Sequence, residues 1–278
     1  GTGNTLSFVQ VNPQRRNITA THLRGRNLGG SCFTTQTGGV PAHNDLIAAI
    51  ELDCLHVPPS VGTSVYLRAE RTLVMGNVVD LNYLGEFTFR TVHFPRSLVQ
   101  HNRFTRPNAG PVERNVIQLR SWTGSTSAGP ADFGPPASAT EYVIVSDNEL
   151  SQDNVGVVVR TCQTNTCGDA PDAQNMQHVI FERNFFQFTA HAGGDGPSQM
   201  GRAFWLEGGD FTIRDNIFDL QGIKLGDGYN NDRLVQTSPN VPSSPGLNDD
   251  DVHVLNNVVY FDETIDRPFR ICSSMGGT

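Results

Sequence analysis

Short runs of alternating apolar and polar residues recur along the whole chain, and seven of them end at an asparagine. The run 143–146 before Asn148 and the run 211–214 before Asn216 are typical, and in most cases an apolar residue follows within two positions. Period-two alternation predicts β-strands with one buried face. One unit repeated many times predicts a solenoid, whose repeats bury their apolar faces against one another. The asparagines are Asn27, Asn77, Asn102, Asn148, Asn184, Asn216 and Asn257.

The asparagines are expected to point inward at a turn. The shortest interval, from Asn77 to Asn102, has the length that three short strands and three tight turns require, and the longer intervals then carry loop insertions. An inward amide both donates and accepts along the stack, so it satisfies turn backbone groups that would otherwise be buried without partners. Any single asparagine could instead be an ordinary turn residue, since asparagine is common in turns. Seven in register favour an internal asparagine ladder.

A second set of apolar segments follows the asparagines, at 47–51, 87–90, 117–120, 157–160, 204–207, 234–236 and 269–272. Alternation divides each segment into side chains that face the core and neighbours that face solvent. The residues expected inside are Phe87, Phe89, Ile117, Leu119, Val157, Val159, Phe204, Leu206, Phe269 and Ile271.

Composition agrees with many short strands and turns. The 278 residues are 37% apolar and include 28 glycines and 16 prolines, and the mean hydropathy is −0.31. No run is apolar and long enough to cross a bilayer, so we expect a soluble protein with no membrane insertion. A formal charge of −8 argues against nucleic acid as a partner, because phosphate contacts need a basic surface. We treat 1–278 as a single domain.

The five cysteines favour a secreted or cell-surface protein. Cys162 and Cys167 bracket a short loop that a disulfide would close, and Cys32 and Cys54 could pair if adjacent coils stack them. Cys272 is then left over. Reduced, buried thiols in a cytosolic protein are the alternative, since no zinc-binding spacing is present. No secretory signal precedes the first residues, so the chain is either a processed form or never carried one.

The segment 98–104, in which an apolar strand ends at Asn102 and Phe104 follows, resembles the coil motif of the right-handed parallel β-helix family in the pectate-lyase-like superfamily. The resemblance extends over residues 17 to 272. It implies an all-β, single-stranded right-handed parallel β-helix of about seven coils, with the asparagine ladder at the turn between the second and third sheets. The second set of segments would then form the first sheet, whose outer face carries the substrate groove in that family.

Long loops are expected beside that first sheet, at 122–140, 162–177, 190–202, 222–233 and 237–251. Long loops without secondary structure are uncommon in compact domains unless they bind a ligand or act as lids. Insertions tolerated between coils are the alternative explanation.

The solvent-facing positions of the first sheet carry Arg90, Arg120 and Arg160. Neighbouring strands lie only about 4.8 Å apart, so these arginines would form a row of like charges. The carboxylates of an acidic polysaccharide would neutralise the row, since a guanidinium matches carboxylate geometry. Acidic loop residues such as Asp153, Asp169 and Asp172 are the alternative counter-charges. The substrate-binding residues expected on this face are Arg90, Gln118, Trp205 and Arg270, with Trp205 stacking on a sugar ring or covered by the following loop.

Cleavage of a uronic acid polymer by β-elimination needs a cation for the carboxylate, a base for the C5 proton and an acid for the leaving oxygen. The resemblance implies that calcium and arginine share this work. Arg120 and Arg160 are the candidates for charge neutralisation or for an arginine base. Glu207 is the nearest carboxylate, and His191 is the candidate acid.

No cofactor is established by the sequence, and calcium is the one candidate. Asp227 and Asp232 lie in an oxygen-rich loop segment beside the first sheet, as a calcium site would require. Neither belongs to an EF-hand pattern, and acidic residues that keep a loop soluble are the alternative.

A non-catalytic adhesin, carbohydrate-binding or structural solenoid is the competing function. The paired aspartates and Gly-His-Gly turn of polygalacturonases are absent, and so is the arginine-proline signature of pectate lyases. The last coil shows no capping helix, and an uncapped solenoid exposes strand edges. The chain is therefore expected to be a fragment or to associate with a partner through that end. The sequence leaves the sugar, the reaction and the oligomeric state open.

Overall fold

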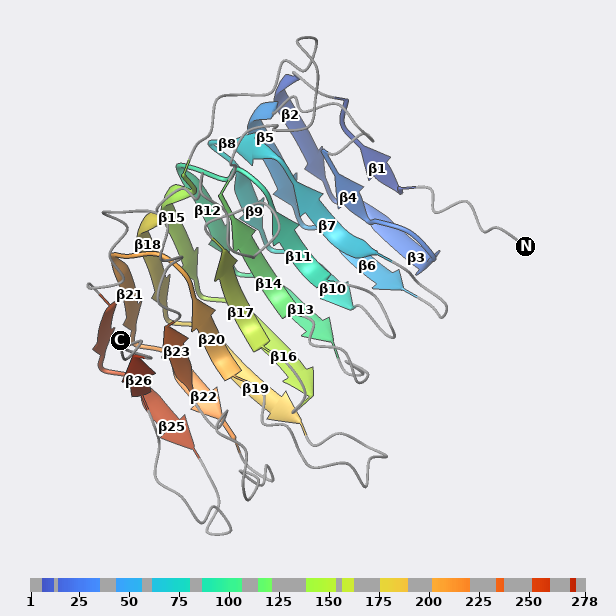
Figure 1. Cartoon of the computed structure of the whole chain (residues 1–278). Coiled ribbons are helices and arrows are strands. Elements are labelled where there is room, and N and C mark those ends of the chain that lie inside the picture. Colours follow the sequence, from blue (N-terminus) through green and yellow to red (C-terminus); the bar gives the residue numbers. More distant parts are fainter. Residues whose placement is uncertain are drawn as a thin grey trace.

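The computed structural model describes residues 7–12, 15–35, 44–56, 62–80, 87–106, 115–121, 139–153, 157–162, 176–189, 202–220, 234–237, 252–260 and 271–273. Within these ranges, all regular structure is β-strand, and every strand pair is parallel (Figure 1). The strands form three sheets, which we name A, B and C. None of the described segments is a helix that is long and apolar enough to cross a membrane.

Sheet A contains nine strands in the order β1 (Val9–Gln10), β4 (Phe33–Thr34), β7 (Thr63–Leu67), β11 (Phe87–Thr91), β14 (Asn115–Arg120), β17 (Val157–Cys162), β20 (Arg202–Leu206), β23 (Val235–Thr237) and β26 (Ile271–Ser273). Sheet B follows the order β2 (Arg16–Thr21), β5 (Asn44–Ile50), β9 (Leu73–Met75), β12 (Ser97–Gln100), β15 (Glu141–Ser146), β18 (Gln177–Glu182), β21 (Phe211–Arg214) and β24 (Val252–Leu255), and β8 (Ala69–Glu70) also pairs with β5. Sheet C contains eight strands, which from the N-terminal end are β3 (Arg24–Leu28), β6 (Asp53–His56), β10 (Val78–Asp80), β13 (Arg103–Arg106), β16 (Glu149–Asp153), β19 (Phe185–Thr189), β22 (Ile217–Asp219) and β25 (Val258–Tyr260).

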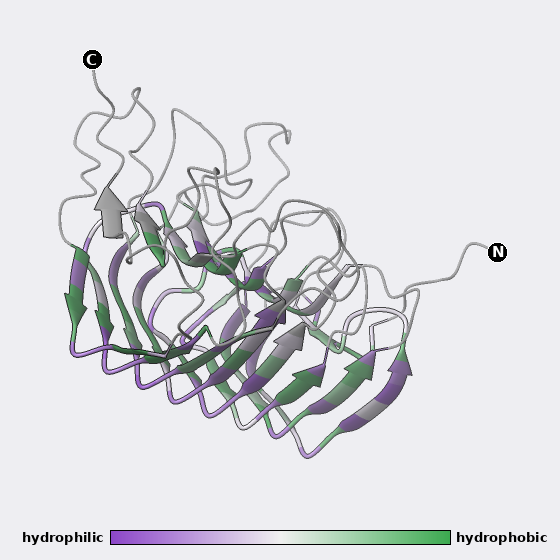
Figure 2. Ribbon diagram, turned by 90° about the horizontal axis from the view of Figure 1, so that it is seen from below, coloured by the Kyte–Doolittle hydropathy of each residue, from purple (hydrophilic) through white to green (hydrophobic). Residues whose placement is uncertain are grey.

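The chain visits sheets A, B and C in turn and then returns to sheet A beside the strand that it left. Strands of successive repeats therefore lie side by side, with their turns in line (Figure 2). This arrangement of three parallel sheets is compatible with a parallel β-helix and confirms the prediction of an all-β repeat architecture.

The core is a continuous stack of apolar side chains from all three sheets. The ring of Phe89 in sheet A stacks on Phe104 in sheet C with centroids 5.7 Å apart. Two repeats further on, Phe186 stacks on Phe218 at 4.7 Å, and Phe204 packs edge-on against Phe218 at 6.1 Å. Each repeat thus completes its core only through contact with its neighbours.

Six of the seven asparagines form a continuous hydrogen-bonded row between sheets B and C. The side-chain amide of Asn77 donates to the side-chain oxygen of Asn102 at 2.8 Å, and each asparagine donates in the same way to the next. The remaining bonds, at 2.9, 2.9, 3.0 and 3.0 Å, join Asn102, Asn148, Asn184, Asn216 and Asn257. Each amide also donates to a backbone oxygen of the preceding repeat, as from Asn102 to Val74 at 2.9 Å.

Asn27 does not belong to this row, so its prediction was wrong. It lies in β3 with an exposed side chain and a φ of 56°. The turn of its repeat comes earlier, at His22 and Leu23, and in the next repeat Leu52 takes the position of the asparagine. The backbone N–H of Leu52 donates to the side-chain oxygen of Asn77 at 2.8 Å. Asn77 is therefore the first asparagine of the row, and Leu52 precedes it in the neighbouring repeat.

Two columns of left-handed residues bracket the strands of sheet B. The first comprises Asn17, Leu46, Arg71, Arg96, Tyr142, His178 and Asp210, with φ between 49° and 59°. The second comprises His22, Glu51, Gly76, His101, Asp147, Arg183, Asp215 and Asn256. Their members recur at a fixed offset within each repeat, so the conformation belongs to the turn and not to the residue type. Because most of these residues are not glycine, sequence composition gives little sign of them.

The second set of predicted strands is mostly confirmed as sheet A. One member is wrong, because 47–51 lies in β5 of sheet B, and β7 holds the corresponding place in sheet A. The side chains expected inside are buried at Phe89, Ile117, Leu119, Val159, Phe204 and Leu206. Phe87 and Val157 are also buried but lie outside the core cluster, whereas Val158, which was expected to face solvent, belongs to the core. The side chains of Phe269 and Ile271 lie outside the described residues.

Cys32 and Cys54 form a disulfide, as predicted from the stacking of coils. Cys54 belongs to β6 of sheet C, and Cys32 immediately precedes β4 of sheet A, so the bond ties two sheets together. Cys162 is disulfide-bonded as well. Cys167, the partner predicted for it, lies outside the described residues, as does the side chain of Cys272.

Candidate functional site

The outer side of sheet A gathers most of the described candidate site residues on four adjacent strands. The register pairs Arg90 of β11 with Gln118 of β14, Gln118 with Arg160 of β17, and Arg160 with Trp205 of β20. We name Arg90, Gln118, Arg160 and Trp205 the outer row. Each of the five long segments predicted beside sheet A connects a strand of this sheet with a strand of sheet B or C, and most of the residues of these segments lie outside the described ranges.

The predicted row of three adjacent arginines was wrong. Arg120 pairs with Cys162, two positions further along the strand than Gln118. Gln118 therefore separates Arg90 from Arg160, and the charge repulsion that the sequence implied between neighbouring strands is relieved by an uncharged amide. The error arose because the segment was read from apolar alternation without knowledge of the register.

The outer side of these strands was also expected to face solvent, and part of it does not. Gln118 is 2% exposed and Arg120 is 7% exposed, while Thr88 beside them is fully buried. Guanidinium groups lie against aromatic rings on this side of the sheet. The guanidinium of Arg90 lies 4.9 Å from the centroid of the Phe87 ring and 5.2 Å from that of Tyr66, and Arg120 lies 5.9 Å from Phe87.

Arg160, Trp205 and Glu207 form a partly exposed group at one end of the outer row. The guanidinium of Arg160 lies 4.1 Å from the centroid of the Trp205 ring, which fixes its plane by a cation–π contact. The same guanidinium lies 3.6 Å from the carboxylate of Glu207. The side chains of Arg160 and Glu207 are 20% and 17% exposed, so the pair is shielded but reachable from solvent.

Thr161 fixes the backbone that carries Glu207. Its hydroxyl accepts a hydrogen bond from the Glu207 N–H at 2.7 Å and donates to the Glu207 carbonyl oxygen at 3.1 Å. Because Thr161 directly follows Arg160 in β17, one strand positions both members of the ion pair. Neither Thr161 nor Tyr66 and Phe87 was identified from the sequence. Thr161 directly follows Arg160 and Tyr66 pairs with Arg90 in the register, whereas Phe87 was expected inside the core.

Gln118 is held by its neighbours within the sheet. Its side-chain nitrogen donates to the side-chain oxygen of Asn115 at 3.1 Å, and Asn115 in turn donates to the backbone oxygen of Val157 at 3.1 Å. This chain of bonds fixes the amide between Arg90 and Arg160. It gives Gln118 a positioning role on the row.

Several predicted site residues lie outside the described part of the chain. These are His191, Arg270, Asp227, Asp232, Asp169, Asp172 and the side chain of Asp153. Among the residues that are described, no group of three or more histidine, cysteine, aspartate or glutamate side chains is arranged to hold a metal ion.

No protein-family model matches this chain, and no curated protein is similar to it.

Proposed function

We propose that this protein is a secreted or cell-surface parallel β-helix of the pectate-lyase-like type that binds an acidic polysaccharide on the outer side of sheet A and cleaves it by β-elimination. The asparagine row would be the internal ladder of that helix. The observation that carries the proposal is the grouping of Arg160, Trp205 and Glu207 in the accessible part of the outer row.

The three side chains suit an acidic sugar. The indole of Trp205 offers an apolar ring face to a pyranose, and the guanidinium of Arg160 stays charged at any working pH and binds a carboxylate through paired N–H groups. The intermediate exposure of both residues leaves room for contact with one sugar unit. The contacts of Arg160 with Trp205 and Glu207 orient its guanidinium before a ligand arrives, which lowers the entropy lost on binding.

The elimination can be assigned to residues as follows. Arg160 binds the uronate carboxylate and stabilises the negative charge that develops on it when C5 loses its proton. Glu207 accepts the C5 proton, the C5–H electron pair forms the C4–C5 double bond, and the C4–O bond breaks. The departing oxygen takes a proton from an acid, a role that we propose for His191. No oxidant or reductant is needed.

The substrate would also compete for the arginine. In the free protein the Glu207 carboxylate lies 3.6 Å from the guanidinium of Arg160. A substrate carboxylate would bind the same guanidinium, whereas a neutral sugar would leave the pair intact.

The buried members of the site would act indirectly. Gln118 and Arg120 contact side chains of the sheet and are too buried for direct contact with a polymer. We assign Gln118 to positioning of the row and Arg120 to its positive potential. Arg90, which is partly exposed, would bind the next acidic sugar along the chain.

The test is the ultraviolet absorbance of the unsaturated product on a panel of uronic acid polymers, each with and without added calcium. Arg160→Ala and Glu207→Gln should each lower turnover at least about 100-fold. Trp205→Ala should mainly raise KM, because it removes a binding surface. Arg103→Ala, which removes an exposed arginine of sheet C paired with Glu149, is the matched control and should leave turnover unchanged.

The competing function is a non-catalytic carbohydrate-binding solenoid. The burial of Gln118 and Arg120 favours it, because it leaves only a short accessible site. Absence of product from every polymer, together with binding that Arg160→Ala abolishes, would establish this alternative and exclude the lyase.

A further inference from the structure

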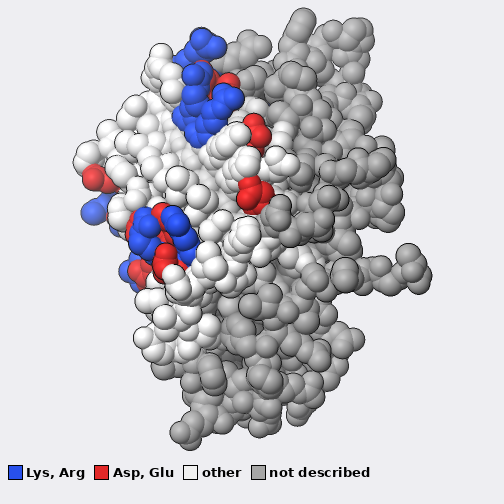
Figure 3. Space-filling view, turned by 90° about the vertical axis from the view of Figure 1, so that its left-hand side faces the viewer, with Lys and Arg blue, Asp and Glu red and all other residues white. Residues whose placement is uncertain are grey.

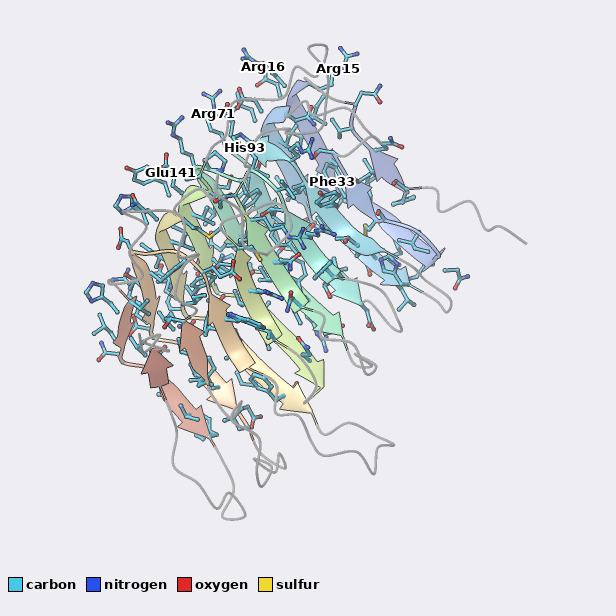
Figure 4. All side chains as sticks on the ribbon, viewed as in Figure 1. Arg15, Arg16, Phe33, Arg71, His93 and Glu141 are labelled. Atoms are coloured by element: carbon cyan, nitrogen blue, oxygen red, sulfur yellow. A yellow bond between two sulfur atoms is a disulfide. The ribbon has the colours of Figure 1, made fainter. Side chains whose placement is uncertain are left out.

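A second cluster of exposed functional side chains lies at the corner where the chain passes from sheet A to sheet B. Arg16 begins β2, while Arg71 and Arg96 lie just before β9 and β12. Figure 4 shows Arg15, Arg16 and Arg71 extending away from the strands along this edge. The pairing of Leu73 with Leu98 places Arg71 and Arg96 on neighbouring repeats at the same height of the turn.

The positive charge of this corner faces solvent, whereas its counter-charges lie beneath. The side chains of Arg16, Arg71 and Arg96 are 73%, 46% and 61% exposed. Asp45, which pairs with Arg16 and Arg71, is only 7% exposed, and Glu70, which lies 3.9 Å from Arg96, is 25% exposed. The space-filling view of this side shows the resulting gathering of positive charge near its top (Figure 3).

An exposed aromatic pair continues the same corner. Tyr142 and His178 occupy the left-handed column two and three repeats from Arg71. Tyr142 is 54% exposed, and its ring stacks on that of His178 with centroids 4.7 Å apart. The Nδ1 of His178 contacts the carboxylate of Asp210. One face of the Tyr142 ring is covered by His178, and the exposed remainder of this apolar ring can contact a sugar.

Left-handed backbone aims these side chains outward together. Arg71, Arg96, Tyr142 and His178 have φ of 49°, 54°, 55° and 53°, a conformation that costs roughly 1–3 kcal/mol at a residue with a bulky side chain. The repeating turn imposes the same direction on each of them. With strands about 4.8 Å apart, the corner from Arg16 to Tyr142 covers four strand spacings, or roughly 19 Å, which accommodates several sugar units.

We propose that this corner, formed by Arg15, Arg16, Arg71, Arg96, Tyr142 and His178, is a second binding site for an anionic polysaccharide and anchors the polymer outside sheet A. Carboxylate or sulfate groups would contact the arginines, and a sugar ring would stack on Tyr142. This inference takes only the class of polymer from the proposed function. The site itself is independent of it, because none of these residues belongs to the outer row.

The chemistry favours a polysaccharide over nucleic acid. Glu141 begins β15 next to Tyr142 and Asp210 pairs with His178, so the aromatic end of the corner is not basic. Along the corner, the arginines are followed by an aromatic ring. A polymer that has anionic groups at intervals and uncharged ring faces matches this order.

The test measures binding of the whole protein to heparin and to polygalacturonate by biolayer interferometry across a salt series. The triple variant Arg15→Ala/Arg16→Ala/Arg96→Ala should weaken binding by about tenfold at low salt and flatten its salt dependence. Arg71 is kept, because it bonds the buried Asp45. Tyr142→Ala should weaken binding and Tyr142→Phe should preserve it. Arg103→Ala is the control for removal of an exposed arginine elsewhere.

The outcomes separate this inference from the proposed function. Weakened polymer binding by the triple variant, with unchanged elimination of a short uronate oligomer, supports the second site. Binding equal to that of Arg103→Ala overturns it, whatever the outer row does. Equal loss of binding to duplex DNA and to both polysaccharides overturns the assignment of a polysaccharide ligand. Loss of turnover in Arg160→Ala, in contrast, reports on the outer row alone.

Discussion

The side-chain amide of Asn102 donates a 2.9 Å hydrogen bond to the side-chain oxygen of Asn148, although the two residues are 46 positions apart. The same bond has a length of 2.8 Å between Asn77 and Asn102, which are 25 positions apart. The longer segment between repeats therefore leaves the stacking distance of the turns unchanged. Insertions are accommodated beside sheet A, while the turn between sheets B and C is kept constant.

Loss of one asparagine from the middle of the row should destabilise the fold. Asn148 accepts bonds from the side chain and backbone of Asn102 and donates to Asn184 and to the backbone of Val99. Asn148→Ala leaves several of these buried partners unsatisfied, so we expect the free energy of unfolding to fall by about 2–4 kcal/mol in urea denaturation. Asn12→Ala, at an exposed position, should change it by less than about 0.5 kcal/mol. A loss at Asn148 no larger than at Asn12 would contradict the role of the row.

Acid should destabilise the protein through His56. Burial lowers the pKa of His56 to about 4, and its Nε2 lies 2.6 Å from the hydroxyl oxygen of Ser64. The unfolded chain takes up this proton near pH 6.5 and the folded protein only near pH 4, so the stability from neutral His56 is complete above pH 6.5 and is lost as the pH falls to about 4. The loss should amount to about 3 kcal/mol.

The pH dependence can be assigned with two variants. Urea denaturation of His56→Gln should show a much smaller fall between pH 6.5 and 4, because glutamine takes up no proton. His253→Gln, at an exposed histidine of β24, should retain the full dependence. The assignment fails if both variants lose stability with pH as the unaltered protein does.

The Cys32–Cys54 disulfide should stabilise the N-terminal repeats. It joins residues 22 positions apart, and the entropy of closing a loop of that length corresponds to about 3 kcal/mol. Cys32→Ala/Cys54→Ala should therefore lower Tm by several degrees in calorimetry under oxidising conditions. Adding a reductant to this double variant tests only the remaining cysteines, including Cys162. An unchanged Tm in the double variant would exclude the stabilising role.

Gly76 should tolerate alanine poorly, although other residue types occupy its column. Its φ is 68°, and a Cβ atom there would lie 3.3 Å from the Cγ of Glu51. Gly76→Ala should cost about 1–2 kcal/mol in the free energy of unfolding. Gly29→Ala is the control, because its Cβ would meet no atom within 4 Å. Equal stability of the two variants would show that the turn absorbs the strain.

The sequence by itself determined the strands, the repeat and most of the row of asparagines. Alternation at 143–146 or 211–214 has the period of a half-buried strand. An asparagine recurs at the same place in successive repeats because each turn has backbone groups that need a hydrogen-bond partner. The same logic failed at Asn27, because the first repeat has an asparagine in its strand and a leucine at its turn. From the sequence alone, an asparagine in a strand cannot be distinguished from an asparagine at the turn, because the distinction depends on which residues lie next to one another in neighbouring repeats.

The candidate site depended on register, which only the tertiary structure decided. Arg90, Arg120 and Arg160 have equivalent places in the sequence pattern, yet parallel pairing places Gln118 between Arg90 and Arg160 and moves Arg120 aside. The sequence did not reveal exposure either, because Gln118 and Arg120 are buried although they were expected on the outer side of the sheet. Alternation fixes which face a side chain takes, whereas its neighbours and its exposure depend on contacts between residues far apart in the chain.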